Sequence, residues 1–303
     1  MQVRPSPAEP GLPAPTPGRK VRRVETDPRD PLVAVAPAEP AEPGSIGFEE
    51  AGFLPPDPDE PPPVELWSAV GDVPPWGTAL HLLAWAAIFA LLAAREQIGD
   101  TAAYLLWGAN ATGLAPFDTA WRLLASTFVH AGAAHVFFNA TSMLIFGPAV
   151  ERIFTRWAFW IVYAFGGAAA SLGSLLWRTS QHGAALNLSV GASGAIFALG
   201  GALLAGAFRL RHRLAPTRAR ALGAALLFLL GQGLVSGFTR HGTDNVAHAV
   251  GLVVGAVLGA VVPLSVRLGG GRPGLAIRAL GALCALALAL SLALALRGGL
   301  ALG

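Results

Sequence analysis

Charged side chains are scarce in this chain. They account for 13% of its 303 residues, whereas ordinary soluble proteins carry about 25%. Hydrophobic residues make up 53% and the mean hydropathy is +0.55, a composition typical of a membrane protein. The isoelectric point near 9.7 does not indicate a nucleic-acid partner, because the arginines lie between apolar runs and do not alternate with aromatic residues.

Several features that would indicate other chemistries are also missing from the sequence. A single cysteine, Cys284, excludes a disulfide framework within the chain and a thiolate metal cluster. The absence of a His-Glu-x-x-His motif disfavours a metalloprotease, and the apolar runs lack the two buried aspartates of an aspartyl intramembrane protease. We therefore expect no metal and no other cofactor.

Proline and acidic residues are concentrated at the start of the chain. Residues 1–75 contain 19 of the 24 prolines and 13 of the 18 acidic residues, but only six of the 21 basic residues. Such a segment cannot bury enough apolar surface to offset the entropy lost on ordering. We expect residues 1–75 to form a disordered, proline-rich, acidic tail on the cytoplasmic side.

Seven apolar segments follow, each close to the length of about 20 residues that a spanning helix needs. We predict helices at 77–94, 134–150, 157–177, 191–208, 220–237, 245–263 and 275–296. The predicted fold is an all-α polytopic membrane protein, with a six-helix core over 76–263 and a linker plus a seventh transmembrane helix over 264–303. The stretch 95–133 is too long and too mixed for a turn, and we expect it to be irregular and partly embedded. The two segments 134–150 and 191–208 contain polar residues and are expected inside the bundle.

The distribution of basic residues predicts the orientation in the membrane. Sixteen of the 21 basic residues fall on the side of the N-terminal tail, which predicts a cytoplasmic N-terminus and an external C-terminus. The composition, rich in Ala, Gly, Arg and Pro, is typical of a GC-rich bacterial genome. We therefore expect a multi-pass protein of the bacterial inner (plasma) membrane.

Polar side chains inside a bilayer are costly and therefore invite a functional explanation. Ser193 lies at the start of the fourth apolar segment, and His248 lies near the start of the sixth. Two crossings separate these starts, so both residues are expected at the external side and at similar depth. The second segment also begins on that side, and its His135 and Asn139 are four residues apart on one helical face.

This set of residues meets the needs of acyl transfer. A serine hydroxyl requires a base to take its proton, and a neutral imidazole is suited to this near pH 7. We predict Ser193 as nucleophile, His248 as base, and His135, Asn139 and the Ser193 N–H as donors to the oxyanion. The glycines at 251, 255 and 259 lie on one face, so the sixth segment is expected to press closely against the fourth.

Several motifs together resemble those of one family. They are Trp121-Arg122, His130-x4-His135-x3-Asn139, Gly191-Ala192-Ser193-Gly194 and Ala247-His248-x2-Gly251-x3-Gly255, in that order. This pattern, spread over 77–263, resembles the rhomboid family of intramembrane serine proteases. The resemblance implies a six-helix core, a Ser193–His248 dyad with no acidic third member, and oxyanion contacts from His135 and Asn139. It also implies an endopeptidase that cleaves single-span transmembrane substrates in the lipid bilayer, with a movable fifth helix and, as in some members, an added seventh.

A few further residues of these motifs and loops have more than one possible role. Phe197 stands where the family often has tyrosine, and its ring is expected to pack against His248. Asp244 and Asn245 either cap the loop or orient His248, and His130 either tunes the site or makes a structural hydrogen bond. Trp121-Arg122 is expected to anchor the first external loop at the membrane interface. The competing functions are a silent rhomboid-like protein that binds membrane clients and a transporter with a histidine relay, for which no inverted repeat is apparent.

Overall fold

The structure, a computed structural model, describes residues 74–301 apart from 184, 215, 240–241 and 266–271. The predicted tail, residues 1–75, therefore lies almost entirely outside the described residues. So does much of the predicted linker that begins at residue 264.

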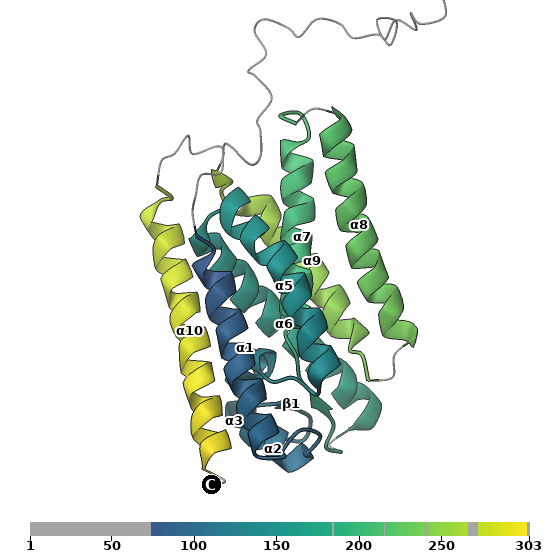
Figure 1. Cartoon of the computed structure of the whole chain (residues 1–303), viewed down its shortest axis with the longest axis vertical. Helices are drawn as coiled ribbons and strands as arrows, with labels where there is room; N and C mark the ends of the chain where they lie inside the picture. The colour runs from purple at the N-terminus through teal and green to yellow at the C-terminus, as the bar shows by residue number, and fades with distance from the viewer. Residues whose placement is uncertain (1–73, 184, 215, 240–241, 266–271, 302–303) are drawn as a thin grey trace, which may run out of the picture. The chain divides into compact units, whose positions relative to one another are not determined.

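The described part of the chain is built from α-helices, and six of them are long and apolar enough to cross a membrane. These six and the shorter α9, with 17 residues, match the seven predicted segments one to one. They are α1 (Trp76–Ala94), α5 (Ala133–Ile153), α6 (Arg156–His182), α7 (Ser193–Leu210), α8 (Pro216–Thr239), α9 (Asn245–Val261) and α10 (Leu275–Leu300). The prediction of an all-α polytopic membrane fold is confirmed, with α8 and α10 at opposite edges of the bundle (Figure 1).

Helices α7 and α9 are in direct backbone contact. A Cβ added at Gly259 of α9 would lie 2.5 Å from the Cα of Ala202 on α7, closer than real Cβ atoms come. A Cβ at Gly251 would overlap the carbonyl of Gly194 in the same way, and Gly255 stands between the two on the same face. The predicted close packing of these segments is confirmed, because glycine alone leaves room for the facing backbone at these positions.

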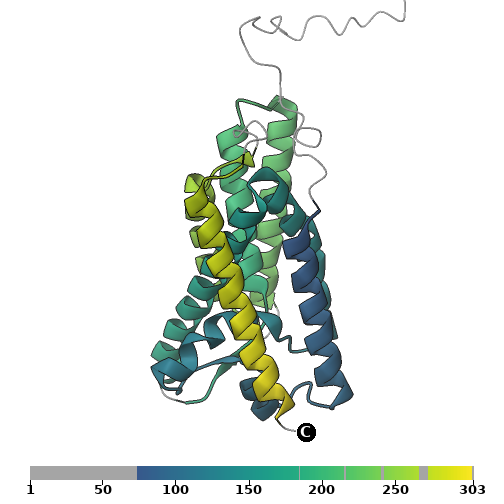
Figure 2. The same cartoon turned by 90° about the vertical axis from the view of Figure 1, so that its left-hand side faces the viewer.

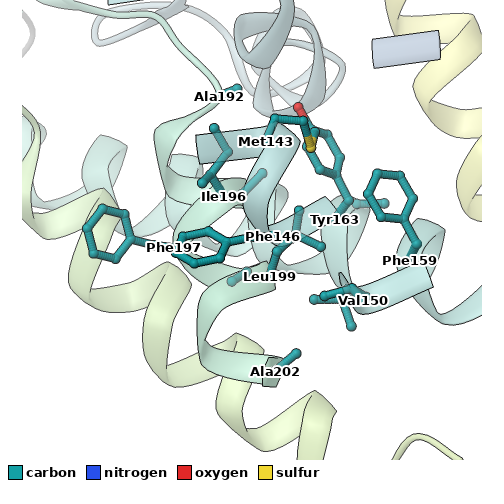
Figure 3. Close-up of a cluster of buried hydrophobic side chains, with 14 of the residues drawn as sticks. Met143, Phe146, Val150, Phe159, Tyr163, Ala192, Ile196, Phe197, Leu199 and Ala202 are labelled. Atoms are coloured by element: carbon teal, nitrogen blue, oxygen red, sulfur yellow. The ribbon is translucent and has the colours of Figure 1, made fainter. Parts of the chain in front are cut away.

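The core lies around α7, in whose apolar window 67% of the residues are buried. Side chains from α5, α6 and α7 fill it, among them Met143, Phe146, Phe159, Tyr163, Ile196 and Leu199 (Figure 3). The expectation that the second segment also lies inside the bundle is wrong, because only 28% of the α5 window is buried. His135 and Asn139 share one face of α5, while Phe137 and Leu144 on the other faces are exposed, as suits a helix in contact with lipid.

A buried carboxylate joins α5 to the start of α1. Glu151 is 2% exposed, and it accepts hydrogen bonds from the backbone N–H of Gly77 at 3.1 Å and of Thr78 at 2.8 Å. The Thr78 hydroxyl donates a third, also at 2.8 Å. The first N–H groups of a helix have no acceptor within it, so Glu151 satisfies donors that would otherwise be buried and unpaired.

The stretch 95–133 is irregular, as predicted, and consists of short elements. They are α2 (Thr101–Leu106), β1 (Asn110–Ala111), α3 (Pro116–Ala120), α4 (Arg122–Ala125) and the 3₁₀ turn η1 (Ser126–Phe128). Arg122 donates to the carbonyls of Leu105, Ala109 and Asp118, and its guanidinium lies 4.6 Å from the centre of the Trp121 ring. The Trp121-Arg122 pair thus ties this stretch to itself.

A two-stranded antiparallel sheet, which the sequence did not predict, joins this stretch to the chain just before Ser193. Strand β1 pairs with β2 (Leu188–Ser189), with Asn110 opposite Ser189 and Ala111 opposite Leu188. The Thr112 hydroxyl extends the pairing, because it accepts from the backbone N–H of Asn187 at 2.9 Å. The loop that leads into α7 is therefore fixed by its hydrogen bonds to the stretch 95–133.

The seventh helix, α10, packs along α6 and reaches the short helix α2. A Cβ on Gly281 would lie 2.8 Å from the carbonyl oxygen of Trp157, and one on Gly299 would overlap the Trp107 ring. Arg95 donates to the Gly299 carbonyl at 3.0 Å. The C-terminal end of α10 thus lies at the same end of the bundle as α2 (Figure 2).

Candidate active site

The two residues predicted as nucleophile and base lie side by side. Ser193 Oγ is 2.8 Å from Nε2 of His248, although 55 positions separate the two in the chain. Ser193 is the first residue of α7 and His248 the fourth of α9, so the backbone contact between these helices also aligns the pair. With the imidazole proton on Nδ1, the serine hydroxyl donates to Nε2, which is the geometry that proton transfer needs.

The turn before Ser193 depends on glycine at position 191. Gly191 has φ +118°, which L side chains rarely adopt, and its N–H donates to the Ser126 carbonyl at 2.9 Å. A Cβ there would lie 2.5 Å from Cε1 and Nε2 of His135. Gly191 therefore lets His135 approach the turn from which Ser193 projects.

The imidazole of His248 is held on one face by an aromatic ring. Phe197, one helical turn after Ser193, stacks on His248 with ring centres 4.3 Å apart and planes 15° apart. This is the packing expected from the sequence, and it needs the phenyl ring but no hydroxyl. Phe197 in turn abuts α8, because a Cβ on Gly233 would lie 2.7 Å from its Cζ.

Asp244 caps α9, and it contacts His248 through the backbone, since its carbonyl accepts from the His248 N–H at 3.1 Å. Its carboxylate accepts from the Ala247 N–H at 3.0 Å, from the Ser189 hydroxyl at 2.9 Å and from the Ser174 hydroxyl. The buried Nδ1 of His248 has no hydrogen-bond partner among the described residues. Of the two roles left open for Asp244, the geometry favours capping.

Two side chains of α5, Asn139 and His135, line the same cavity as the Ser193–His248 pair. Asn139 is 6% exposed, and its Nδ2 is buried without a hydrogen-bond partner. The same nitrogen would lie 3.5 Å from a Cβ on Gly191, so it is near the turn that carries Ser193. His135, one turn earlier on the same face, contacts that turn directly. An amide N–H that is buried, unpaired and close to a serine is suited to an oxyanion acceptor.

These groups line one cavity. It has a volume of about 1320 Å³ and is bordered by residues of α5, α6, α7, α8 and α9 and of the loop that carries β2. Ser193, His248, His135 and Asn139 all line it. A cavity of this size can admit an extended peptide segment and water to a bundle that is otherwise packed.

His130 lies behind the site and not in it. It is 1% exposed, and its ring meets the edges of Trp85 at 5.2 Å and of His135 at 5.1 Å between centres. Burial, with a smaller contribution from the neighbouring His135, lowers the pKa of His130 to about 3, and the Phe128 carbonyl opposes the shift. The ring is therefore neutral near pH 7 and supports the position of His135.

Some residues of the site had no signal in the sequence. Arg178 lines the cavity, and it donates to Ser174 Oγ at 3.0 Å and to the Asn187 carbonyl at 2.5 Å. Ser174 and Ser189 reach Asp244 from separate elements. Such contacts come from the tertiary arrangement, and one sequence does not reveal them.

The fold and this site define a polytopic helical membrane protein with a serine–histidine pair at one end of two packed helices. A family model described as "Rhomboid domain" matches residues 118–264, which include the pair and both α5 residues. Over these residues the chain is therefore similar to the rhomboid family.

Curated relatives agree with this family. The chain is 30% identical to "Rhomboid protease GluP" of Bacillus subtilis over 190 residues, which are 63% of this chain and 35% of that protein. It is 30% identical to "Putative rhomboid protease YdcA" of the same bacterium over 138 residues, 46% of this chain and 65% of that protein. It is 32% identical to "RHOMBOID-like protein 4" of Arabidopsis thaliana over 148 residues, 48% of this chain and 34% of that protein. The chain thus spans less than two thirds of the length of these relatives.

Proposed function

We propose that this protein is an intramembrane serine endopeptidase that cleaves transmembrane segments of membrane proteins through a Ser193–His248 dyad. The observation that carries the proposal is the 2.8 Å separation between Ser193 Oγ and His248 Nε2, at the edge of a cavity within the helix bundle. The names of the relatives, which include rhomboid proteases of Bacillus subtilis, support the same reaction.

In the first half of the reaction, Ser193 Oγ attacks the carbonyl carbon of the scissile peptide bond. Its proton passes to Nε2 of His248, and the carbonyl oxygen becomes an oxyanion. Asn139 Nδ2, His135 and the Ser193 N–H donate to that oxygen. The intermediate then collapses, the C–N bond breaks, and His248 returns the proton to the leaving amine.

In the second half, water that enters the cavity attacks the acyl-enzyme. His248 takes a proton from the water, and the ester bond to Ser193 breaks as the proton returns to the serine oxygen. The Phe197 ring keeps the imidazole in place through both halves, because the Nδ1 side of His248 has no carboxylate partner to do so.

The substrates we propose are single-span membrane proteins, because the bundle opens a cavity beside a site that lies within membrane-spanning helices. Helical segments must unwind to present a peptide bond, since the backbone of a membrane helix is fully hydrogen-bonded. From the basic residues we propose a cytoplasmic N-terminus and an external C-terminus. From the composition we propose a bacterial inner membrane. We propose that α8 moves to admit the substrate, because only 17% of the residues in its apolar window are buried.

The test is incubation of the purified full chain with a single-span model substrate in liposomes. Wild-type protein should cleave it, whereas Ser193→Ala and His248→Ala should each abolish cleavage while their thermal unfolding in detergent stays near that of the wild type. Cleavage that survives Ser193→Ala would rule out the dyad.

A fluorophosphonate probe separates an enzyme from a silent relative that only binds membrane clients. It should label Ser193 covalently in the wild type, with the adduct located by mass spectrometry, and labelling should disappear in His248→Ala. A folded wild-type protein that neither reacts with the probe nor cleaves substrate would favour the silent relative.

A further inference from the structure

A second polar group lines the catalytic cavity, at the end of α6. Arg178 is 9% exposed, and two of its three guanidinium nitrogens are engaged, Nε with the Ser174 hydroxyl and one terminal nitrogen with the Asn187 carbonyl. The other terminal nitrogen, Nη2, is buried and has no hydrogen-bond partner. Leaving a charged donor unpaired is costly, so an acceptor delivered to this nitrogen would be bound favourably.

The two charged side chains that line the cavity differ in how many of their polar atoms have hydrogen-bond partners. Among the described residues that line it, Arg178 and Asp244 are the only ones of the Asp, Glu, Lys and Arg types. The Asp244 carboxylate already accepts three hydrogen bonds, from Ser174, Ser189 and the Ala247 N–H. Of these two charged groups only Arg178 keeps a polar atom without a partner, and a hydrogen-bond acceptor with a negative charge satisfies that atom best.

The contacts that hold Arg178 also fix its place relative to the nucleophile. Its partner Asn187 stands directly before β2, which leads through Gly191 to Ser193. Its partner Ser174 donates to Asp244, the cap of the helix that carries His248. A substrate segment that binds at Ser193 and extends along the cavity therefore passes the end of α6. The guanidinium of Arg178 lies at this end of α6.

We propose that Arg178 is a specificity-determining residue that binds an Asp or Glu side chain of the substrate. This side chain belongs to the substrate segment that flanks the scissile bond, next to the end of α6 and the loop before Ser193. This rests on the proposed protease function and adds to it the chemical class of the preferred substrate. The carboxylate accepts from the unpaired Nη2 of Arg178, so substrates with an acidic residue at one position of that flanking segment are preferred over those with a basic one.

The test scans a single-span model substrate with Glu, Gln and Lys at each position of the flanking segment. In wild-type protein, Glu at one position should raise kcat/KM over Lys by about tenfold or more, as a charge-assisted hydrogen bond predicts. Arg178→Lys should keep the preference, Arg178→Gln should remove it, and Arg178→Glu should reverse it in favour of Lys. Arg95→Gln is the matched control, because Arg95 donates to the Gly299 carbonyl and does not line the cavity.

The ratio between substrates, and not the rate, decides the result. A merely structural Arg178 would lower cleavage of all substrates equally in Arg178→Gln, and an unchanged Glu-over-Lys ratio there would overturn the proposal. Equal cleavage of all three substrates by wild-type protein would overturn it as well, without any variant of Arg178. Dissociation constants of the same segments for Ser193→Ala give the preference without cleavage, so a failed activity and a failed preference remain distinguishable.

Discussion

Gly191 and His135 are in contact across the site, and a Cβ on Gly191 would lie 2.5 Å from two atoms of the His135 ring. Position 191 requires glycine for two reasons: its backbone has a positive φ, and a side chain there would overlap the His135 ring. The position of His135, the proposed oxyanion donor, is thus set by the turn that carries Ser193, the proposed nucleophile.

Gly191→Ala should therefore displace His135 and distort the turn before Ser193. We expect kcat to fall about 10²-fold or more, as when an oxyanion donor is lost. Gly132→Ala is the control, because Gly132 also lines the cavity, has an extended backbone and leaves open space for a Cβ. Steady-state cleavage of the model substrate measures both, and equal activity in the two variants would contradict the role given to Gly191.

Gly233→Ala should disturb His248 from a distance. Its Cβ would lie 2.7 Å from Cζ of Phe197, whose ring is stacked on His248 and can move only by changing that stack. We expect kcat to fall by up to about tenfold, the value of one aromatic pair. Gly231→Ala, two residues earlier on α8 with no atom within 4 Å of its Cβ, should leave kcat unchanged.

Removal of Glu151 should destabilise the fold without touching the site. Glu151→Ala leaves the N–H groups of Gly77 and Thr78 buried without an acceptor, which we expect to cost on the order of 3 kcal/mol. Glu151→Gln keeps one acceptor oxygen and should lose less. Thermal unfolding in detergent measures the order, and a Glu151→Ala protein as stable as the wild type would contradict the contacts described.

His130 should make the protein less stable in mild acid. Its pKa is lowered to about 3 in the folded protein and returns to its ordinary value near 6.5 on unfolding. Below pH 6.5 the unfolded chain binds a proton that the folded one does not, so stability falls with pH until about pH 3. The drop in melting temperature between pH 7.5 and pH 4.5 should be smaller in His130→Asn than in wild type, and an equal drop would contradict the prediction.

The sequence predicted all seven membrane helices, because long apolar runs carry their own signal. The boundaries were less certain where polar residues continue a helix. The segment predicted to end at 177 continues as α6 to His182, because its last turns project beyond the apolar run. The segment predicted to begin at 191 begins at Ser193, because Gly191 adopts a left-handed backbone that no helix continues.

The site could be predicted only in part. That Ser193, His248, His135 and Asn139 lie around one cavity could be predicted, because polar residues in apolar segments are rare and their helices begin on one side. The strands β1 and β2 were missed, because two residues each carry no recognisable pattern. The contacts of Arg178 were missed for a related reason, since they depend on how α6 meets the loop before α7.

The glycine contact between α7 and α9 means that the distance between Ser193 and His248 is set by the contact of one main chain with another. A side chain has several rotamers, whereas two touching backbones have one closest approach, so the pair has little freedom to drift apart. Sequence changes on the lipid-facing surfaces of α1, α5, α8 and α10 can therefore adapt the protein to bilayers of different thickness while the reacting atoms keep their spacing.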